Sequence, residues 1–264
     1  MRRLGRPRLR KRYEDRRTHS RLVEQLSEED LQRLNELLPW RCFTVDAKGR
    51  PLGGTAWRGK RDMPEVIPDP RIERFHARFD LSDKHVLEIG CFEGIHTIAL
   101  CGLAERVTAV DARIENVVKT IVRCAFFELH PRVFVCDVED PGDEDRLRAD
   151  LCHHSGVLYH LDDPVGHLRR LGTWISRGLM LDTHYALDGD ATETYEVDGD
   201  RFRYRRYREG GAADVFSGMR PTSKWLRLED IVSELERAGF GTVEVVETRE
   251  ERNGPRVLLF AERG

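Results

Sequence analysis

The chain has 264 residues and a formal net charge of −3 at pH 7, and 39% of its residues are hydrophobic. This length allows one large α/β domain with attachments and a sizeable core. No run of about 18 apolar residues occurs, which excludes a transmembrane helix. The N-terminus lacks the apolar stretch of a signal peptide, so we expect a cytoplasmic protein. The six cysteines form no CxxC pair, which favours reduced core residues.

The net charge conceals a basic N-terminal arm. Residues 1–17 hold nine Lys or Arg and two acids, a balance of +7 against a total of −3, so the remainder carries about −10. Because apolar residues are few there, we expect residues 1–19 to form a disordered, solvated arm. Such an arm can also attract nucleic acid or an anionic surface.

Residues 20–80 read as an N-terminal segment that is partly helical and partly irregular. The sequence "SEED" predicts a helix start with a capping box between Ser27 and Asp30. A leucine stripe follows at helical spacing and stops at Pro39. Residues 40–69 are rich in Gly and Pro and predict an irregular entry segment.

From residue 81 to 264, strand and helix patterns alternate. We predict strands at 85–89, 106–110, 132–136, 150–157, 178–184, 242–248 and 255–261, and helices at 93–104, 114–125, 164–176 and 227–238. In the second helix, one face is formed by Ile114, Val117, Val118, Ile121 and Ala125. This order predicts an α/β domain with a parallel sheet covered on both faces. The last two strands suggest an antiparallel hairpin at one edge.

An insertion at 185–222 interrupts the alternation. Its stretch "TYEVDGDRFRYRRY" flanks an Asp-Gly pair with alternating side chains, which predicts a β-hairpin. The first arm is acidic and the second is rich in arginine, so we expect cross-strand ion pairs. The alternative is an arginine patch that grips a phosphate or stacks on a base. Placed after the fifth strand, the insertion suits a lid over an acceptor.

Three acids lie at successive predicted strand ends, where open α/β sheets bind ligands. Glu88 and the glycines of "VLEIGCFEG" form a strand-to-helix turn that lets a ligand approach the backbone. Without a G-x-G-x-x-G triple, a pyrophosphate cofactor is disfavoured. Asp111 suits two ribose hydroxyls or a helix N-cap. Asp137 suits an adenine amino group.

The stretches "VLEIGCFEG", "VTAVDA", "CDVED" and "GVLYHLDDP" resemble, in order and spacing, the class I S-adenosylmethionine-dependent methyltransferases. The last stretch resembles the subgroup that includes the tRNA wobble-uridine carboxymethyl transferases. The resemblance implies a Rossmann-like, seven-stranded sheet with an antiparallel last strand, and S-adenosyl-L-methionine along its C-terminal edge. The implied cofactor-binding residues are Glu88, Gly90, Cys91, Phe92, Gly94, Asp111, Ala112, Asp137, Val138, Ser155 and Gly156.

The stretch "DLCHHSGVLYHLDDP" and the end of the fifth strand supply candidate acid–base groups. Methylation of a hydroxyl requires removal of its proton, and histidine titrates in the useful range. We favour His184, with Asp182 nearby, slightly over His160, which could equally fix its loop. His153 and His154 point to opposite faces of the strand, so we expect buried, hydrogen-bonded side chains rather than a shared metal.

A divalent cation among Asp162, Asp163, Asp182 and His184 is chemically possible, but no spacing is diagnostic and we expect no metal. We predict O-methylation of a small polar acceptor, such as a sugar or secondary-metabolite hydroxyl, bound by Tyr159, Tyr185, Arg220, Lys224 and Trp225. The alternative is a tRNA-modifying methyl- or carboxymethyltransferase. A nucleic-acid partner is the weaker reading, because the body is acidic and no RNA-binding module is visible.

Overall fold

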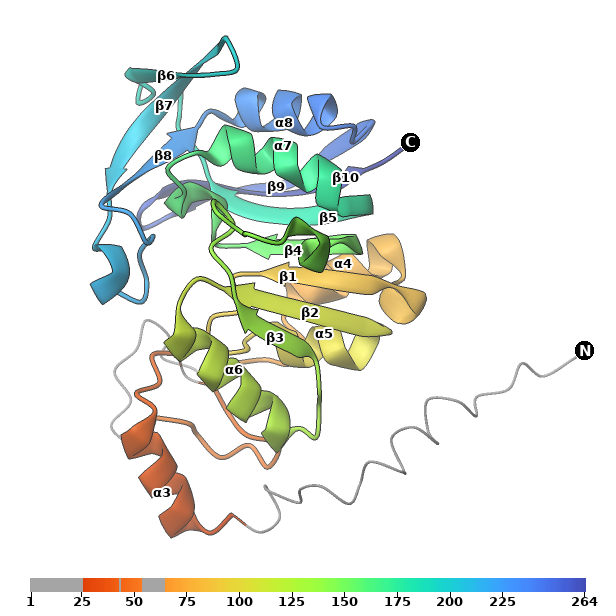
Figure 1. Cartoon of the computed structure of the whole chain (residues 1–264), viewed down its shortest axis with the longest axis vertical. Coiled ribbons are helices and arrows are strands. Elements are labelled where there is room, and N and C mark those ends of the chain that lie inside the picture. Colours follow the sequence, from red (N-terminus) through yellow and green to blue (C-terminus); the bar gives the residue numbers. More distant parts are fainter. Residues whose placement is uncertain (1–25, 43, 54–64) are drawn as a thin grey trace, which may run out of the picture.

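The computed structural model describes residues 26–42, 44–53 and 65–264. The arm predicted over residues 1–19 lies outside the described residues. From residue 85 onward, strands and helices alternate, and the strands form two sheets (Figure 1). In the part that is described, no helix is both long enough and apolar enough to cross a membrane.

The main sheet has seven strands in the order β3-β2-β1-β4-β5-β10-β9. Its strands are β1 His85–Ile89, β2 Arg106–Asp111, β3 Arg132–Val135, β4 Ala149–Ser155, β5 Ile175–His184, β9 Thr242–Glu251 and β10 Gly254–Glu262. Only β10 runs against the others, between β5 and β9. The predicted Rossmann-like α/β sheet with an antiparallel last strand is confirmed.

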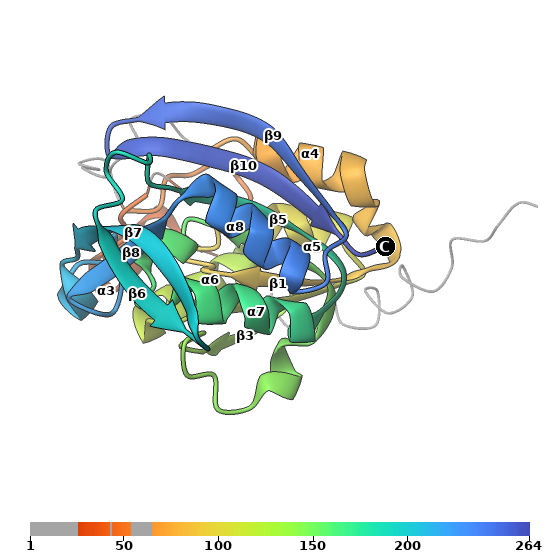
Figure 2. The same cartoon turned by 90° about the horizontal axis from the view of Figure 1, so that it is seen from above.

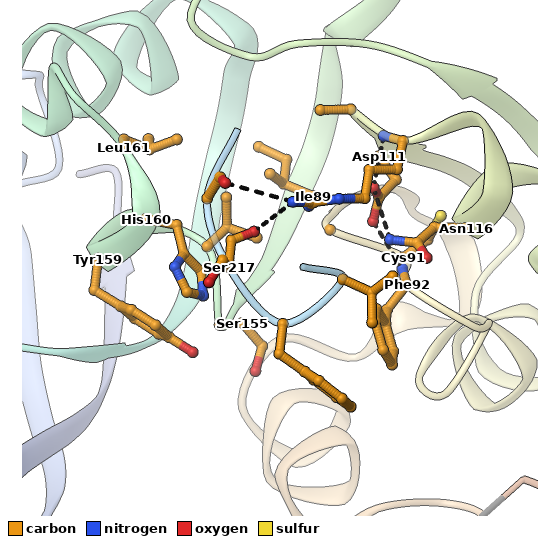
Figure 3. Close-up of a pocket in the computed structure, with 18 of the residues that line it drawn as sticks. Ile89, Cys91, Phe92, Asp111, Asn116, Ser155, Tyr159, His160, Leu161 and Ser217 are labelled. Atoms are coloured by element: carbon orange, nitrogen blue, oxygen red, sulfur yellow. Dashed lines mark hydrogen bonds between the residues drawn. The ribbon is translucent and has the colours of Figure 1, made fainter. Parts of the chain in front are cut away.

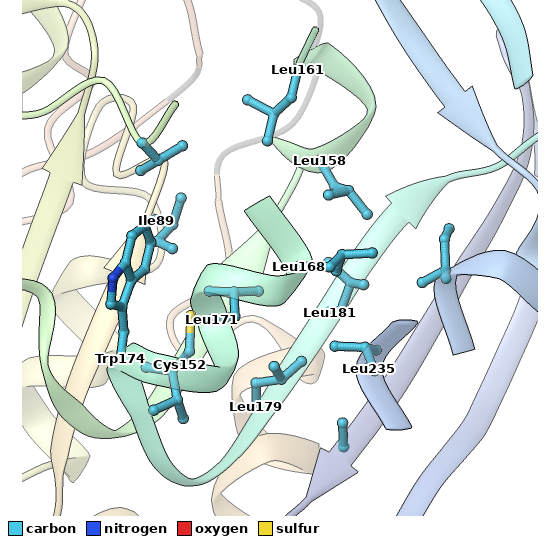
Figure 4. Close-up of a cluster of buried hydrophobic side chains, with 14 of the residues drawn as sticks. Ile89, Cys152, Leu158, Leu161, Leu168, Leu171, Trp174, Leu179, Leu181 and Leu235 are labelled. Atoms are coloured by element: carbon cyan, nitrogen blue, oxygen red, sulfur yellow. The ribbon is translucent and has the colours of Figure 1, made fainter. Parts of the chain in front are cut away.

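Helices cover both faces of this sheet, so its central strands β1, β4 and β10 are buried almost throughout, with successive side chains on opposite faces. They are α4 Pro70–Phe79, α5 Thr97–Leu103, α6 Ile114–Phe126, α7 Pro164–Trp174 and α8 Leu228–Arg237. Leu87 and Ile89 pack in a core with residues of α7 and α8 (Figure 4), whereas Val86 packs with residues of α4 and α5. Figure 2 shows α7 and α8 side by side.

The helix α4 was not among the predicted elements, although its start carries a recognisable signal. Asp69 caps it by accepting a hydrogen bond from the backbone N–H of Arg71 at 2.9 Å, and Pro70 occupies the first turn. The helix α5 begins at Thr97 rather than at residue 93, because residues 91–96 form turns around Gly94, whose φ is +72°.

The predicted apolar stripe of α6 forms only part of its buried face, because Val117 is buried whereas Val118 is 36% exposed. Ile114 and Ile121 are 57% and 48% exposed, whereas Lys119 and Arg123 are buried. The Lys119 ammonium donates to Glu93 Oε1 at 2.9 Å and to the Pro39 carbonyl at 2.8 Å. Paired and hydrogen-bonded, these charges tolerate burial, and the preceding N-terminal segment packs over them.

That N-terminal segment contains the helix α3 Glu28–Leu37, close to its predicted bounds. Ser27 Oγ accepts from the backbone N–H of Asp30 at 3.1 Å and donates to its carboxylate at 2.7 Å, which confirms the predicted cap. The leucines of α3 pack with Trp40, Leu52 and Phe126 against α6. The segment therefore braces one flank of the sheet.

The insertion forms a second, three-stranded antiparallel sheet of β6 Glu193–Val197, β7 Asp200–Arg208 and β8 Thr222–Leu226. The predicted hairpin is confirmed, and its Asp198-Gly199 turn has positive φ at both residues. The third strand was not predicted. Arg201 pairs with Glu196 and Arg206 with Glu193 across the hairpin, as expected. Asp198 and Asp200, however, pair with Arg169 of α7, which ties the hairpin to the main domain.

Candidate functional site

A cavity of about 730 Å³ lies at the C-terminal ends of β1, β2, β3 and β4 and reaches the end of β5 (Figure 3). Ligands of open α/β sheets bind at this edge. Twelve residues expected at the site line the cavity: Gly90, Cys91, Phe92, Asp111, Ala112, Asp137, Val138, Ser155, Gly156, Tyr159, His160 and His184. Seven other expected residues lie outside the lining: Glu88, Gly94, Asp182, Tyr185, Arg220, Lys224 and Trp225.

The turn after β1 brings backbone into the cavity. Gly90 has a φ of +81°, and a Cβ added there would lie 2.3 Å from Val157 Cγ2. The N–H groups of Gly90 and Cys91 donate to the carbonyl of Val110, at 2.8 and 3.0 Å. Only glycine permits this conformation together with this close approach of the two strand-end loops.

Asp111 at the end of β2 is held in one orientation by three donors. Its Oδ1 accepts from the Arg113 N–H at 2.9 Å and from the Asn116 amide at 3.0 Å, and its Oδ2 accepts from the Phe92 N–H at 3.1 Å. Burial raises the pKa of Asp111, and these hydrogen bonds oppose that rise. A carboxylate offers about four lone-pair sites, so roughly one remains for a ligand hydroxyl.

Asp137 follows β3 and lies in the lining beside Cys136 and Val138. Its Oδ1 accepts from the Glu139 N–H at 3.0 Å, and its Oδ2 lies 3.8 Å from an Arg220 guanidinium nitrogen. Arg220 therefore contacts this acid, although it is not itself part of the lining. The arrangement places one carboxylate beside an apolar wall, which suits the edge and the face of a purine.

Glu88 does not reach the cavity. Its carboxyl is 1% exposed and accepts a hydrogen bond from Thr97 Oγ1 at 2.6 Å. Burial raises the pKa of Glu88 to about 8. The expected contact between Glu88 and a bound cofactor does not fit this position, because Glu88 lies on the α4 and α5 side of β1, beneath the turn.

A histidine–carboxylate pair faces the cavity at the turn after β4. The Nδ1 atom of His160 lies 2.9 Å from Glu209 Oε1, and the Glu209 carboxylate also accepts from Ser223 Oγ at 2.7 Å and from the Gly218 N–H at 2.9 Å. Burial would raise the pKa of Glu209, but these hydrogen bonds outweigh it and the pKa stays below its ordinary value. Glu209 is thus an ionised acceptor.

That pairing fixes which nitrogen of His160 carries the proton. With Nδ1–H donating to a carboxylate, Nε2 keeps its lone pair. Sequence reasoning missed Glu209, since it lies 49 residues from its partner at the end of the hairpin. The only signal in the sequence is that Glu209 is an acidic residue directly after the arginine-rich stretch 201–208.

His184 ends β5 in an aromatic setting. Its ring stacks on Trp225 with centroids 4.8 Å apart, and its Nδ1 lies 3.1 Å from the Pro255 carbonyl oxygen. Burial and the Arg256 charge lower the pKa of His184, so the neutral ring is favoured. Trp225 is a buried anchor rather than a cavity wall, and it also stacks on Tyr207.

Asp182 is fully buried and is held by arginines. Its carboxylate accepts from Arg249 at 2.9 Å and from Arg256, and an Arg71 nitrogen lies 3.7 Å away. These three arginines line the cavity, whereas Asp182 does not. The expected acid–base role of Asp182 does not fit, because its oxygens are taken up in fixing the three guanidinium groups.

Tyr159 and Lys224, two of the residues expected to bind the acceptor, have different surroundings. Tyr159 lines the cavity, with the Arg256 guanidinium 5.5 Å from its ring centroid. Lys224 instead donates to the Asp162 carboxylate at 2.7 Å and lies over the Tyr195 ring. Within the described residues, Asp162, Asp163, Asp182 and His184 do not form a group close enough to hold one cation.

A loop at 211–219 covers the cavity, and its residues Val215 to Met219 belong to the lining. Arg113 ties it down by donating to the carbonyls of Asp214 at 2.9 Å and Ser217 at 2.8 Å, among others. The Phe216 ring lies 5.5 Å from that of Phe92. The sequence predicts a lid-like insertion over residues 185–222, and the hydrogen bonds from Arg113 to this loop were not predicted.

The adjacent histidines of β4 do point to opposite faces of the sheet. His154 Nε2 lies 2.9 Å from His167 Nε2 of α7, so His154 is buried and hydrogen-bonded as predicted. His153 is buried toward α4 and α5, but neither of its ring nitrogens has a hydrogen-bond partner among the described residues. The prediction of a hydrogen-bonded His153 is wrong.

Comparison with known proteins sets this site in context. No family model matches the chain. The tRNA U34 carboxymethyltransferase of Pseudomonas aeruginosa is 29% identical over 176 residues, which cover 66% of this chain and 51% of the relative. That of Alteromonas mediterranea is 29% identical over 183 residues, with the same coverage. The chain therefore spans about half the length of the curated relatives it matches.

Solved structures share the fold more completely. The N-terminal domain of EvdMO1, crystallised in the presence of S-adenosylhomocysteine and D-fucose, aligns over 89% of this chain and 96% of its own, with 24% identity and a TM-score of 0.72. Magnesium protoporphyrin IX methyltransferase of Synechocystis, with bound S-adenosylhomocysteine, covers 74% and 81% at 17% identity, with a TM-score of 0.54.

The strand order and these neighbours define the class: the fold is that of the class I S-adenosylmethionine-dependent methyltransferases. Within that class, the particular proteins that the chain resembles are the tRNA U34 carboxymethyltransferases in sequence and the EvdMO1 domain in structure.

Proposed function

We propose that this protein is a methyltransferase that binds S-adenosyl-L-methionine in the 730 Å³ cavity and methylates a hydroxyl of a small polar acceptor. One observation carries the proposal. A single cavity is lined by the strand-end acids Asp111 and Asp137 and by His160, whose Nδ1 pairs with Glu209 behind the lining. A nucleoside site and an acid–base group thus share one cavity.

The donor occupies the half of the cavity formed by the ends of β1, β2 and β3. Asp111 accepts a ribose hydroxyl at its remaining lone pair, while Asp137 and Val138 adjoin the adenine. Gly90 and Cys91 expose backbone to the methionine portion, and Ser155 and Gly156 lie opposite them. A sulfonium donor needs little activation, so the chain's own work is positioning and exclusion of water.

His160 is the base we prefer for the acceptor hydroxyl. Its Nδ1 faces the ionised Glu209, so a proton taken up at Nε2 produces an imidazolium that the carboxylate stabilises. Burial and the positive Arg256 lower the pKa of His184, although its Nδ1 faces the Pro255 carbonyl and its Nε2 lies 3.8 Å from Glu251 Oε2. His184 then serves to shape the wall beside Tyr159, whose ring centroid lies 4.7 Å away.

A sugar or a similarly small polyol is the acceptor we favour. Residues 215–219 of the inserted segment line the cavity and narrow the acceptor side, which suits a small molecule better than a folded RNA. The EvdMO1 domain, which shares the fold, was crystallised with D-fucose present. Both points support a hydroxyl acceptor of monosaccharide size.

A second candidate is tRNA modification. It is favoured by the tRNA U34 carboxymethyltransferases among the relatives at 29% identity, and by the basic residues 1–17. The subgroup likeness of "GVLYH" at 156–160 supports the same reading.

The test has two stages. Calorimetric titration of S-adenosylhomocysteine should give micromolar binding to the wild type, and Asp111→Ala should abolish it while the exposed control Asp188→Ala should not. Transfer of labelled methyl from S-adenosylmethionine to monosaccharides and to bulk tRNA then separates the acceptors. Labelling of tRNA alone would overturn the small-acceptor proposal, and no binding by the wild type would overturn both.

A further inference from the structure

Three potential metal ligands converge beside the floor of the cavity, outside the acid–base machinery described above. Glu88 comes from β1, His96 from the cap of α5, and His153 from β4. Each offers one ligand atom, and the three atoms lie within 4.8 Å of one another. Glu88 and His153 are register partners on neighbouring parallel strands, so the sheet itself brings two of the ligands together.

His153 is the unusual member of this group. It is 1% exposed, and both ring nitrogens lack a hydrogen-bond partner within the described part of the chain. Buried polar groups are almost always satisfied, and an unsatisfied one costs free energy. Its neighbour His154, equally buried on the opposite face, does have a partner in His167. The unpaired ring of His153 faces His96, with ring centroids 4.7 Å apart.

We propose that Glu88, His96 and His153 bind one divalent first-row transition-metal ion of zinc-like chemistry. Two imidazole nitrogens and one carboxylate oxygen are a ligand set that zinc uses, at about 2.0–2.2 Å from the metal. Ligands of a tetrahedral site lie roughly 3.5 Å apart, so ligand atoms within 4.8 Å of one another need to close by at most about 1.3 Å. A fourth position would remain open to water.

The surroundings suit such a site. Asp69 Oδ2 lies 3.7 Å from His96 Nε2, and ligating histidines commonly pair their second nitrogen with a carboxylate. Glu88 would bind the ion as a carboxylate and release its proton to solvent. Arg71 Nη2 lies 3.1 Å from His96 Nε2, so metal binding through the other ring nitrogen would require Nε2–H to donate to Asp69 in place of accepting from Arg71.

The metal ion would cross-link two segments of the chain beside the cavity. It would join the turn that follows β1 to β4, and of its three ligands only His96 belongs to the cavity lining. We therefore expect the ion to fix the segment that carries Cys91 and Phe92 rather than to contact the acceptor. The proposal does not depend on which acceptor the enzyme uses, nor on methyl transfer.

The experiment uses the full chain, stripped with a chelator and dialysed. Titration with Co²⁺, followed by visible absorption and calorimetry, should give one ion per chain, and Zn²⁺ should displace it. Glu88→Gln and His153→Leu should each weaken Co²⁺ binding by more than the roughly 10–100-fold that loss of an outer partner costs. His130→Gln, an exposed histidine, is the control and should bind as the wild type does.

Thermal unfolding provides a readout independent of affinity. Zn²⁺ should raise the Tm of the wild type and of His130→Gln but not that of His153→Leu. In the metal-free state, His153→Leu should be as stable as the wild type or more so, because it removes an unsatisfied buried group. No stoichiometric Co²⁺ binding by the folded wild type, or equal binding by Glu88→Gln and His153→Leu, would overturn the proposal.

Discussion

The Nδ1 atom of His160 lies 2.9 Å from the Oε1 atom of Glu209, although 49 residues separate the two in the chain. His160 belongs to the turn after β4, and Glu209 ends the hairpin of the second sheet. The pair therefore forms only when the inserted sheet is seated on the main domain. Glu209, which belongs to the inserted segment, thus orients His160 in the cavity lining.

Glu209→Gln should lower kcat by about 10²-fold or more while KM for the acceptor changes little, because an amide neither fixes the tautomer nor stabilises the imidazolium. Steady-state methyl transfer at several pH values is the measurement. Glu196→Gln, an exposed acid on β6, is the matched control and should leave kcat unchanged. A wild-type kcat for Glu209→Gln would exclude His160 as the base.

Asp182→Asn should destabilise the fold by about 3–5 kcal/mol, because it leaves Arg71, Arg249 and Arg256 short of a buried counter-charge. Urea unfolding checks this. The control Asp188→Asn removes an exposed acid and should cost no more than about 1 kcal/mol. If Asp182→Asn abolished kcat with unchanged unfolding, Asp182 would be catalytic after all.

Arg113→Met should loosen the covering loop, since the guanidinium donates to several loop carbonyls. Hydrogen bonds to charged groups contribute about 1.5–3 kcal/mol, so amide exchange in residues 211–219 should accelerate roughly 10–100-fold. Exchange mass spectrometry on the free protein is the measurement. Arg201→Met, on the exposed hairpin, should leave amide exchange in that loop unchanged. Equal exchange rates in the two variants would contradict the role of the Arg113 hydrogen bonds in holding the loop.

Gly90→Ala and Gly142→Ala form a matched pair, because both glycines have positive φ but only Gly90 has a close neighbour at the Cβ position. Each substitution should cost about 1–2 kcal/mol from backbone strain. Gly90→Ala should cost roughly 1–3 kcal/mol more through its collision with Val157, and it should also weaken S-adenosylhomocysteine binding. Similar unfolding midpoints for the two variants would contradict the close approach of the loops.

Stability should depend on pH through His85. Burial, helped by Arg106, lowers the pKa of His85 to about 4, against an ordinary value of 6.5. Since the unfolded chain takes up this proton first, the contribution is complete above pH 6.5 and is lost as the pH falls toward 4. His85→Gln should flatten that part of the curve by about 1–2 kcal/mol, allowing for solvent screening.

Urea unfolding across that range, with the exposed His130→Gln as control, measures the effect. An unchanged slope in His85→Gln would assign the titration to another group.

The sequence by itself determined the alternation of strands and helices, the strand-end positions of Asp111 and Asp137, and the Asp-Gly turn of the hairpin. These follow from local periodicity and turn chemistry, which act over a few residues. The cavity-lining loop at 90–92 could also be predicted from the sequence, because a strand-to-helix turn depends on residues that are close together in the chain.

Only the tertiary structure decided the partners of the charged groups. Asp182 faces arginines from α4, β9 and β10, and Glu209 reaches His160 across the two sheets. The buried face of α6 is set by Lys119 meeting Glu93 and by the N-terminal segment packing over it, not by the isoleucines of its own stripe. Such pairings join residues far apart in the chain, and a local pattern carries no information about which charge a fold will bring within 3 Å of another.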